Sequence, residues 1–463
     1  MANPFDRCSN VTDLVCEQPS ADHLSKGFRE YVDHTFIPGY KKLLANLLPS
    51  DVVEHTRSVA QEYGVLSGRV SDKPFFVSDE DMGINGAVGN SCALVIPGKR
   101  ASPLRVIFAH SDIPCLRAIA PHCEMDAESS LYAGNFYFAT KAVGGIRAED
   151  WYGRNVVVLG HIYQNGRRRL VKINGLIEQS SAHTDAKDAI KPLRRLRVTT
   201  PYRTLDKAFK ALGIQDSMDF GRSGLYVFPA NSNPHEVGSR LSALGQDDRS
   251  CHHAAYTAGL ENLTTDNTVA IFSLDHEEIG SIGNSGGWRG FVKKVLRETL
   301  RRKYGREFRA ADFPDMLNER GFGGLPAICA DVDVAFSGAE LDEKDEDRID
   351  FRRAAVAGWG FFICADNTPF CRATSPKHVD GLMTLFDGKL PGRRKRDRYQ
   401  VTWGPHSADS DFSSASMAEV FDGIMPMVDL GVPLISTHHP GSENLNKWDL
   451  AWLKEGLAVY ITN

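Results

Sequence analysis

The sequence predicts an α/β fold that is interrupted by a mostly β segment. From about residue 240 onward, helical and strand-like stretches alternate, at residues 251–263, 269–274, 292–304 and 327–334. This alternation is typical of a sheet that has helices on its faces. Residues 118 to about 200 instead carry short β-branched runs separated by turn signals such as Gly144-Gly145. With 463 residues, the chain is long enough for two or three domains of roughly 100–200 residues each.

The other elements follow from the spacing of apolar residues. Residues up to about 65 place apolar side chains at helical intervals, as Leu43, Leu44, Leu47 and Leu48 show, and are predicted to be helical. Short apolar runs predict strands at residues 75–77, 93–96 and 104–109. A further helix is predicted near residues 205–212.

Composition excludes several classes of protein. The net charge of −5 and the pI near 6.3 argue against a nucleic-acid binder, which usually carries a basic excess. The strongest apolar runs, at 156–159 and 361–365, are far shorter than the roughly 20 residues of a membrane span, so no membrane partner is expected. The nine cysteines form no CxxC pair, and the first residues resemble no export signal. Both features predict a cytoplasmic protein with reduced thiols.

Several chemically versatile residues lie where predicted strands end or helices begin. His110 follows an apolar run, and Asp112 could orient its ring, although this triplet alone is also typical of a surface turn. Asp247 opens the helix predicted at 251–263, where a carboxylate is also typical of a helix cap. Glu277 and Glu278 follow the strand at 269–274 directly, and two adjacent carboxylates are costly to ionise together without a cation.

A divalent metal ion would explain these positions together. With such an ion present, one of two adjacent glutamates can bind it while the other accepts a proton from water. Asp331 and His438 also end short apolar runs. Two histidines and three carboxylates suit a pair of zinc ions about 3.5–4 Å apart, with Co²⁺ or Mn²⁺ as alternative metals. The predicted ligands are His110, Asp247, Glu278, Asp331 and His438.

These motifs resemble those of the M18 family of metallopeptidases, the aspartyl aminopeptidases. The family's His-Thr-Asp-Ser-Pro-Cys-Leu motif is similar to residues 110–116, and its Asp-His-Glu-Glu-Val-Gly-Ser motif matches residues 275–281 except for one isoleucine. Its Leu-Asp-Asp/Asn-Arg, Ser-Ala-Asp and closing histidine motifs resemble residues 246–249, 329–331 and 428–438. The resemblance extends from about residue 75 to 460 and is weak in the first 60 residues.

The resemblance implies a fold and a set of roles. It implies an α/β/α catalytic domain of the di-zinc aminopeptidase type at residues 1–116 and 236–463, with an inserted β-rich dimerisation domain at 117–235. It also implies that Asp247 bridges two metals, that Glu277 is the general base and that Asp112 orients His110. His183 lies in a segment similar to one that reaches a neighbouring subunit's active site in the family. Family members assemble from dimers into dodecamers, so a homo-oligomer is expected.

Some positions depart from the family's pattern. The family has two histidines after its aspartate ligand and a lysine at the end of a nearby strand, whereas here Val334 and Ser337 replace the histidines and residues 360–365 carry no lysine. Recognising a buried acidic side chain needs a cationic or strong donor partner. Substitutes could come from loops, at Arg372, Lys377 or His406. The departures favour an altered residue preference, toward neutral or modified amino-terminal residues.

The predicted function is therefore a zinc aminopeptidase that hydrolyses the amino-terminal residue of peptides or small aminoacyl substrates. Two alternatives remain. A di-zinc amidohydrolase that acts on a small acylated metabolite would use the same ligands and differ only in its pocket. A non-catalytic scaffold would be expected to have lost a ligand or Glu277, and neither is lost.

Overall fold

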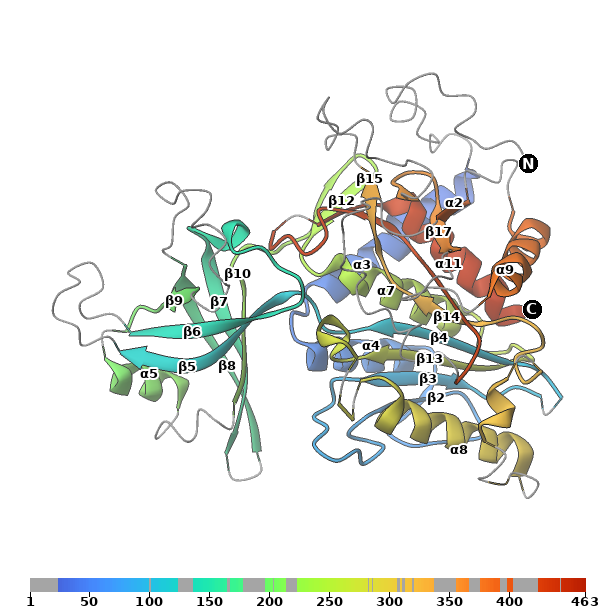
Figure 1. Cartoon of the computed structure of the whole chain (residues 1–463), viewed down its shortest axis with the longest axis horizontal. Helices are drawn as coiled ribbons and strands as arrows, with labels where there is room; N and C mark the ends of the chain where they lie inside the picture. Colours follow the sequence, from blue (N-terminus) through green and yellow to red (C-terminus); the bar gives the residue numbers. More distant parts are fainter. Residues whose placement is uncertain are drawn as a thin grey trace. The chain divides into compact units, whose positions relative to one another are not determined.

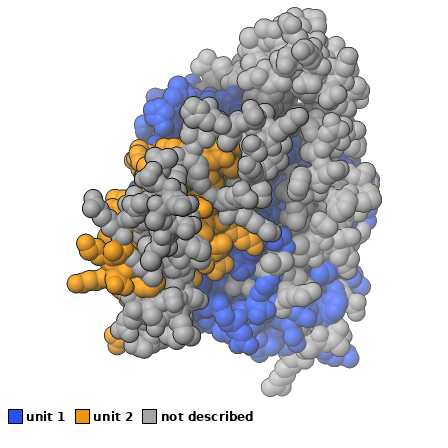
Figure 2. Space-filling view, turned by 60° about the vertical axis from the view of Figure 1, so that its left-hand side comes forward, with its two compact units in different colours: residues 1–112, 234–437, 444–463 blue, residues 113–233, 438–443 orange. Residues whose placement is uncertain are grey.

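The structure is a computed structural model that divides into two compact units, coloured separately in Figure 2. Unit 1 contains residues 1–112, 234–437 and 444–463, and unit 2 contains residues 113–233 and 438–443. The sequence places the domain boundaries at 116/117 and 235/236, and it places 438–443 in the catalytic domain. The residues that the structure describes are 24–99, 101–123, 136–164, 167–177, 196–202, 204–213, 223–281, 283–284, 286–305, 309, 313–318, 320–336, 355–365, 375–391, 398–402, 424–441 and 443–463.

Unit 1 is built on a nine-stranded sheet (Figure 1). Its central strands β13, β4, β14 and β19 run parallel to one another, whereas β3 runs antiparallel to β13. In sheet order the strands are β1 Leu66–Ser67, β2 Phe75–Ser78, β3 Cys92–Ile96, β13 Thr268–Leu274, β4 Leu104–His110, β14 Ala327–Ala330, β19 Met427–Gly431, β17 Phe361–Cys364 and β18 Tyr399–Thr402.

Helices cover both faces of this sheet, because alternate strand residues point to two separate cores. Ile107 and Ile271 pack in the core that contains α7 and α11, whereas Phe108 and Phe272 pack in the core that contains α8. The predicted α/β class is thereby confirmed. The helical elements of this unit are α2 Lys26–Tyr31, η3 Val32–Phe36, α3 Ile37–Leu44, α4 Pro49–Glu62, α7 Gln246–Glu261, η6 Glu277–Ile279, η7 Trp288–Val292, α8 Lys293–Tyr304, η10 Asp315–Leu317, α9 Pro376–Lys389 and α11 Lys447–Thr462.

A second sheet of unit 1 corrects one sequence prediction. Residues 327–334 were predicted as one strand, but the chain leaves the large sheet at Asp331 and enters the second sheet as β15. Asp331 interrupts the apolar run here, but apolar residues resume at Val332 and Val334, so the pattern alone does not show that the chain changes sheet. The strands of the second sheet, in order, are β11 His235–Val237, β12 Arg240–Ala243, β21 Glu443–Asn446, β20 Pro433–Ile435, β15 Asp333–Phe336 and β16 Ala355–Val356.

In the part of unit 2 that the structure describes, six strands form a closed barrel, against which the helix α5 packs. Trp151 and Phe138 are fully buried in its core, where Phe209 of the helix α5 also packs. The helix begins at a Thr204 cap, whose side chain accepts the N–H of Lys207. The elements of this unit are β5 Cys115–Cys123, β6 Phe136–Val143, η4 Glu149–Trp151, β7 Asn155–Gln164, β8 Arg167–Leu176, β9 Arg197–Thr199, α5 Leu205–Leu212 and β10 Ser223–Pro229.

Two findings bear on the expected environment. Among the described residues, no helix is long and apolar enough to cross a membrane. Five described cysteines are buried free thiols, namely Cys92, Cys115, Cys251, Cys329 and Cys364.

A buried carboxylate fixes the loop that enters β17. Asp449, in the first turn of α11, accepts the N–H groups of Gly358 at 2.6 Å and Gly360 at 2.7 Å. Gly360 has φ +80, and a side chain there would collide with the Arg398 carbonyl. Burial raises the pKa of Asp449 to about 7, although both N–H bonds act to lower it.

This pKa predicts a pH-dependent stability. Between about pH 4 and pH 7 the folded chain binds more protons at Asp449 than the unfolded chain, so the group's contribution to stability falls as pH rises. Asp449→Asn cannot titrate and loses one acceptor, so we expect it to lower the free energy of unfolding by about 2 kcal/mol near pH 5. The difference from wild type should narrow toward about pH 8, measured by urea unfolding. A difference that stays constant with pH would contradict this assignment.

Candidate metal centre

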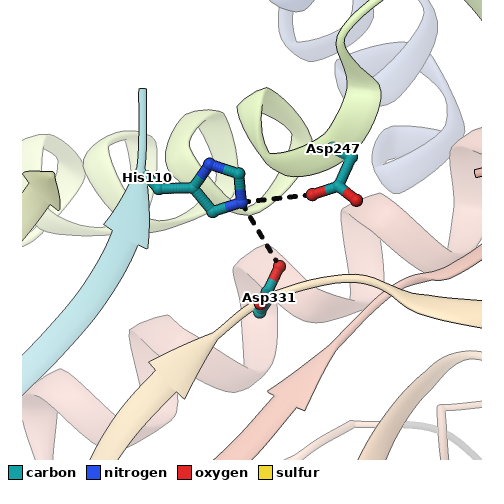
Figure 3. Close-up of side chains that lie close together, drawn as sticks. All are labelled: His110, Asp247 and Asp331. Atoms are coloured by element: carbon teal, nitrogen blue, oxygen red, sulfur yellow. Dashed lines mark hydrogen bonds and ion pairs between the residues drawn. The ribbon is translucent and has the colours of Figure 1, made fainter. Parts of the chain in front are cut away.

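Three of the predicted ligands meet at one edge of the large sheet of unit 1. His110 is the last residue of β4, Asp331 directly follows β14, and Asp247 lies in the first turn of α7. Because β4 and β14 are parallel neighbours, their carboxyl ends lie at the same edge. Figure 3 shows both carboxylates facing the His110 ring.

The donor atoms of these three residues fit a metal ion. His110 Nε2 lies 3.1 Å from Asp247 Oδ1 and 3.6 Å from Asp331 Oδ1. The other ring nitrogen, Nδ1, lies 3.1 Å from the Asp112 carbonyl oxygen, which can only accept, so Nδ1 carries a proton. If the ring is neutral, its Nε2 lone pair points at two carboxylate oxygens. This arrangement needs a cation, and one nitrogen with oxygen donors suits zinc.

Without such an ion, a proton takes the cation's place on His110. The ring is buried, which by itself lowers its pKa, but hydrogen bonds to Asp112, Asp247 and Asp331 hold the pKa well above its usual value. A divalent ion at Nε2 would displace this proton.

Glu277 lies beside the same ring nitrogen. Its Oε2 is 3.8 Å from His110 Nε2, and its side chain is only 7% exposed. Its Oε1 is buried and has no hydrogen-bond partner among the described residues. Burial raises the pKa of Glu277 well above its usual value, and Asp331, Asp112 and Asp247 add to the shift, while His110 opposes it. A buried carboxylate without a structural partner is a candidate for proton transfer.

Glu278 belongs to the same cluster in unit 1. A carboxylate oxygen of Glu278 lies within 4.8 Å of a carboxylate oxygen of Asp247. Asp247 is the residue that is expected to bridge two metals. Asp112 accepts the backbone N–H groups of Glu277 and Glu278, each at 3.1 Å. Asp112 therefore contacts the glutamate pair as well as His110.

His438 and His183 are the two remaining predicted residues. His438 belongs to unit 2, where its Nδ1 donates to the Gly145 carbonyl oxygen at 3.1 Å and its backbone N–H donates to Glu443 at 2.9 Å. With the proton on Nδ1, the neutral ring carries its lone pair on Nε2, the form in which a histidine binds metal. His183 lies outside the described residues.

The structure also shows features that sequence reasoning missed or left open. Asp248 is fully buried and accepts the backbone N–H of His110 at 3.2 Å, so it supports the ligand from behind. The adjacent carboxylates in residues 246–249 were the available signal. Asp247 and Asp248 have non-helical backbone angles inside α7, so the regular part of this helix begins after them, and the helix-cap alternative for Asp247 stays open. The peptide bond between Asp247 and Asp248 is cis.

Comparisons with known sequences find the family that the sequence motifs resemble. Residues 165–312 match the family model described as Aminopeptidase I zinc metalloprotease (M18). A probable M18 family aminopeptidase 1 of Thermotoga neapolitana is 28% identical over 231 residues, 44% of this chain and 49% of that protein. The chain thus spans about half the length of the first curated relatives that it matches. A relative of the same name from Borreliella burgdorferi is 24% identical over 90% of this chain and 93% of its own.

Solved structures extend the likeness to the whole fold. An M18 aminopeptidase structure from Thermotoga maritima superposes with a TM-score of 0.77 at 20% identity, covering 96% of this chain and 98% of that one. Aminopeptidase I from Borrelia burgdorferi superposes with a TM-score of 0.72 at 18% identity, covering 96% and 99%. Sequence and fold together confirm the resemblance of this chain to the M18 family of metallopeptidases.

Proposed function

We propose that the protein is a zinc-dependent aminopeptidase that releases the amino-terminal residue of peptides. The observation that carries this proposal is the convergence of Asp247 and Asp331 on His110 Nε2, with Glu277 beside them, whose Oε1 has no hydrogen-bond partner among the described residues. The names of the family model and of the curated relatives support the same activity.

Five residues would hold two zinc ions: His110, Asp247, Glu278, Asp331 and His438. Zinc supplies a Lewis acid that makes water more acidic and polarises the scissile carbonyl. Glu277 accepts the proton from the attacking water and returns it to the leaving amine. Its burial excludes competing solvent, and its raised pKa shows how strongly this position disfavours charge until a cation is bound.

We further propose a homo-oligomer, built from dimers into a dodecamer, in the cytoplasm. The S. cerevisiae mApe1 dodecamer superposes with a TM-score of 0.65 at 16% identity, covering 94% of this chain and 96% of that one. The buried free thiols fit a reducing compartment. In such an assembly His183 would act in the active site of a neighbouring subunit, as the resemblance implies.

The residue preference is proposed to have shifted away from aspartate and glutamate. Strand β17 is fully buried and carries no lysine, and the half-buried Val334 stands where the family has a histidine. An acidic side chain would therefore lose two of its polar partners on entering the pocket. Neutral residues need no such partner.

A substrate panel at fixed zinc tests activity and preference together. We expect amino-terminal Leu, Ala or Gln substrates to be cleaved faster than Asp or Glu substrates, and N-acetylated versions to resist cleavage. A preference of about tenfold or more for Asp or Glu, worth about 1.4 kcal/mol, would contradict the shifted preference. Faster cleavage of the N-acetylated versions would instead indicate the amidohydrolase. No turnover of any substrate by zinc-loaded protein would favour the scaffold.

A further inference from the structure

The carboxylate of Asp112 holds the turn that carries the glutamate pair. Its Oδ1 accepts the N–H of Glu277 and its Oδ2 accepts the N–H of Glu278, each at 3.1 Å. These are the first two N–H groups of η6, which have no partner inside so short a helix. Asp112 is only 6% exposed, so both bonds are shielded from water.

His110 does not depend on this side chain in the same way. Its Nδ1 donates to the backbone carbonyl oxygen of Asp112 at 3.1 Å, whereas the carboxylate Oδ1 is farther away, at 3.4 Å. The backbone carbonyl remains whichever side chain occupies position 112. The ring is also fixed from behind, because the N–H of His110 donates to Asp248.

The turn around η6 needs such external support. His276 and Ser281 have positive φ values of 69° and 52°, which are unfavourable for residues with a side chain. Two bonds close the turn on itself: the Ser281 N–H donates to the His276 carbonyl at 2.7 Å, and the Gly280 N–H donates to the Glu277 carbonyl at 2.8 Å. The Asp112 carboxylate then fixes the start of η6, where Glu277 and Glu278 lie.

We infer that Asp112, beyond its contact with His110, is a positioning residue for the Glu277–Glu278 turn. This inference rests on the proposed function, in which Glu277 is the base. Each carboxylate oxygen accepts one N–H, so both oxygens are needed. An asparagine keeps one acceptor but turns an NH₂ group toward the other backbone N–H, which it repels.

The test compares Asp112→Asn with wild type in the zinc-loaded protein. We expect amide hydrogen exchange at Glu277 and Glu278 to be about tenfold faster or more. In the variant one of the two N–H groups loses its acceptor, and the bond of the other is no longer charge-assisted. We expect kcat to fall about 10²-fold with KM unchanged, because the base is misplaced while substrate binding is not. The dissociation constant of the zinc ion at His110 should stay within about threefold of the wild-type value, measured by equilibrium dialysis with zinc alone.

Two further variants make the result decisive. Asp449→Asn removes the same kind of carboxylate bond to two backbone N–H groups, at Gly358 and Gly360, and should leave exchange at Glu277 and Glu278 and kcat unchanged. Asp112→Ala removes both acceptors without adding a donor and should accelerate the same two amides.

The opposite pattern overturns the inference. If exchange at the two amides stays at the wild-type rate while the tightest zinc site weakens about 10–100-fold, Asp112 acts through His110. Exchange and zinc binding are measured without turnover. An inactive wild-type protein would therefore refute the proposed function, while the hydrogen-exchange rates at Glu277 and Glu278 would still test this inference.

Discussion

Glu277→Gln is expected to retain zinc and to lose nearly all turnover. Glutamine has the shape of glutamate but cannot accept the proton of the attacking water, and a positioned general base typically contributes about 10²–10⁴-fold to the rate. The structure favours this role because Glu277 is buried beside His110 Nε2 while its Oε1 has no partner among the described residues. We expect kcat to fall by about that factor with KM little changed, measured on the best substrate of the panel.

The neighbouring glutamate provides the matched control. Glu278→Gln makes the same chemical change one residue away, but Glu278 is expected to bind metal, so this variant should lose zinc as well as activity. Elemental analysis after dialysis distinguishes the two. If Glu277→Gln loses zinc and Glu278→Gln keeps it, the roles of base and ligand are exchanged.

The sequence predicts the parts of the site that depend on local pattern. An apolar run that ends at a polar residue indicates the carboxyl end of a buried strand, and His110 is indeed the last residue of β4. The same reasoning located the acidic turn after β13, at Glu277. Parallel strands align their carboxyl ends, so the meeting of His110 and Asp331 follows from the α/β class itself.

The contacts that depend on tertiary packing were not predictable in this way. The chain passes from β14 to β15 of another sheet across Asp331, and the apolar residues on each side of Asp331 suit either sheet. Asp248 contacts the backbone of His110 from 138 positions away in the sequence, and no periodicity marks such a bond. Likewise, the motif suggested that Asp112 orients a ring, whereas its carboxylate also holds two N–H groups more than 160 residues away.

Asp247→Ala is expected to remove metal binding as well as activity. One carboxylate oxygen of Asp247 faces His110, and a carboxylate oxygen of Asp247 lies within 4.8 Å of one of Glu278. If Asp247 bridges two zinc ions, its loss weakens the binding of both. The expected loss of affinity exceeds the roughly 10–100-fold cost of removing an outer-shell partner. Elemental analysis of protein dialysed against zinc should fall from about two ions per chain to less than one.

Asp248→Asn is the control for this prediction, because asparagine still offers an oxygen to the His110 N–H and Asp248 is not an expected ligand. It should therefore keep both ions.

The pH dependence of zinc binding gives a second check. Since His110 has a raised pKa without metal, protons compete with zinc, and wild-type affinity should decline as pH falls. Removing Asp247 removes one cause of that raised pKa, so residual zinc binding in Asp247→Ala should depend less steeply on pH. Full zinc occupancy in Asp247→Ala would show that this carboxylate does not bridge the metals.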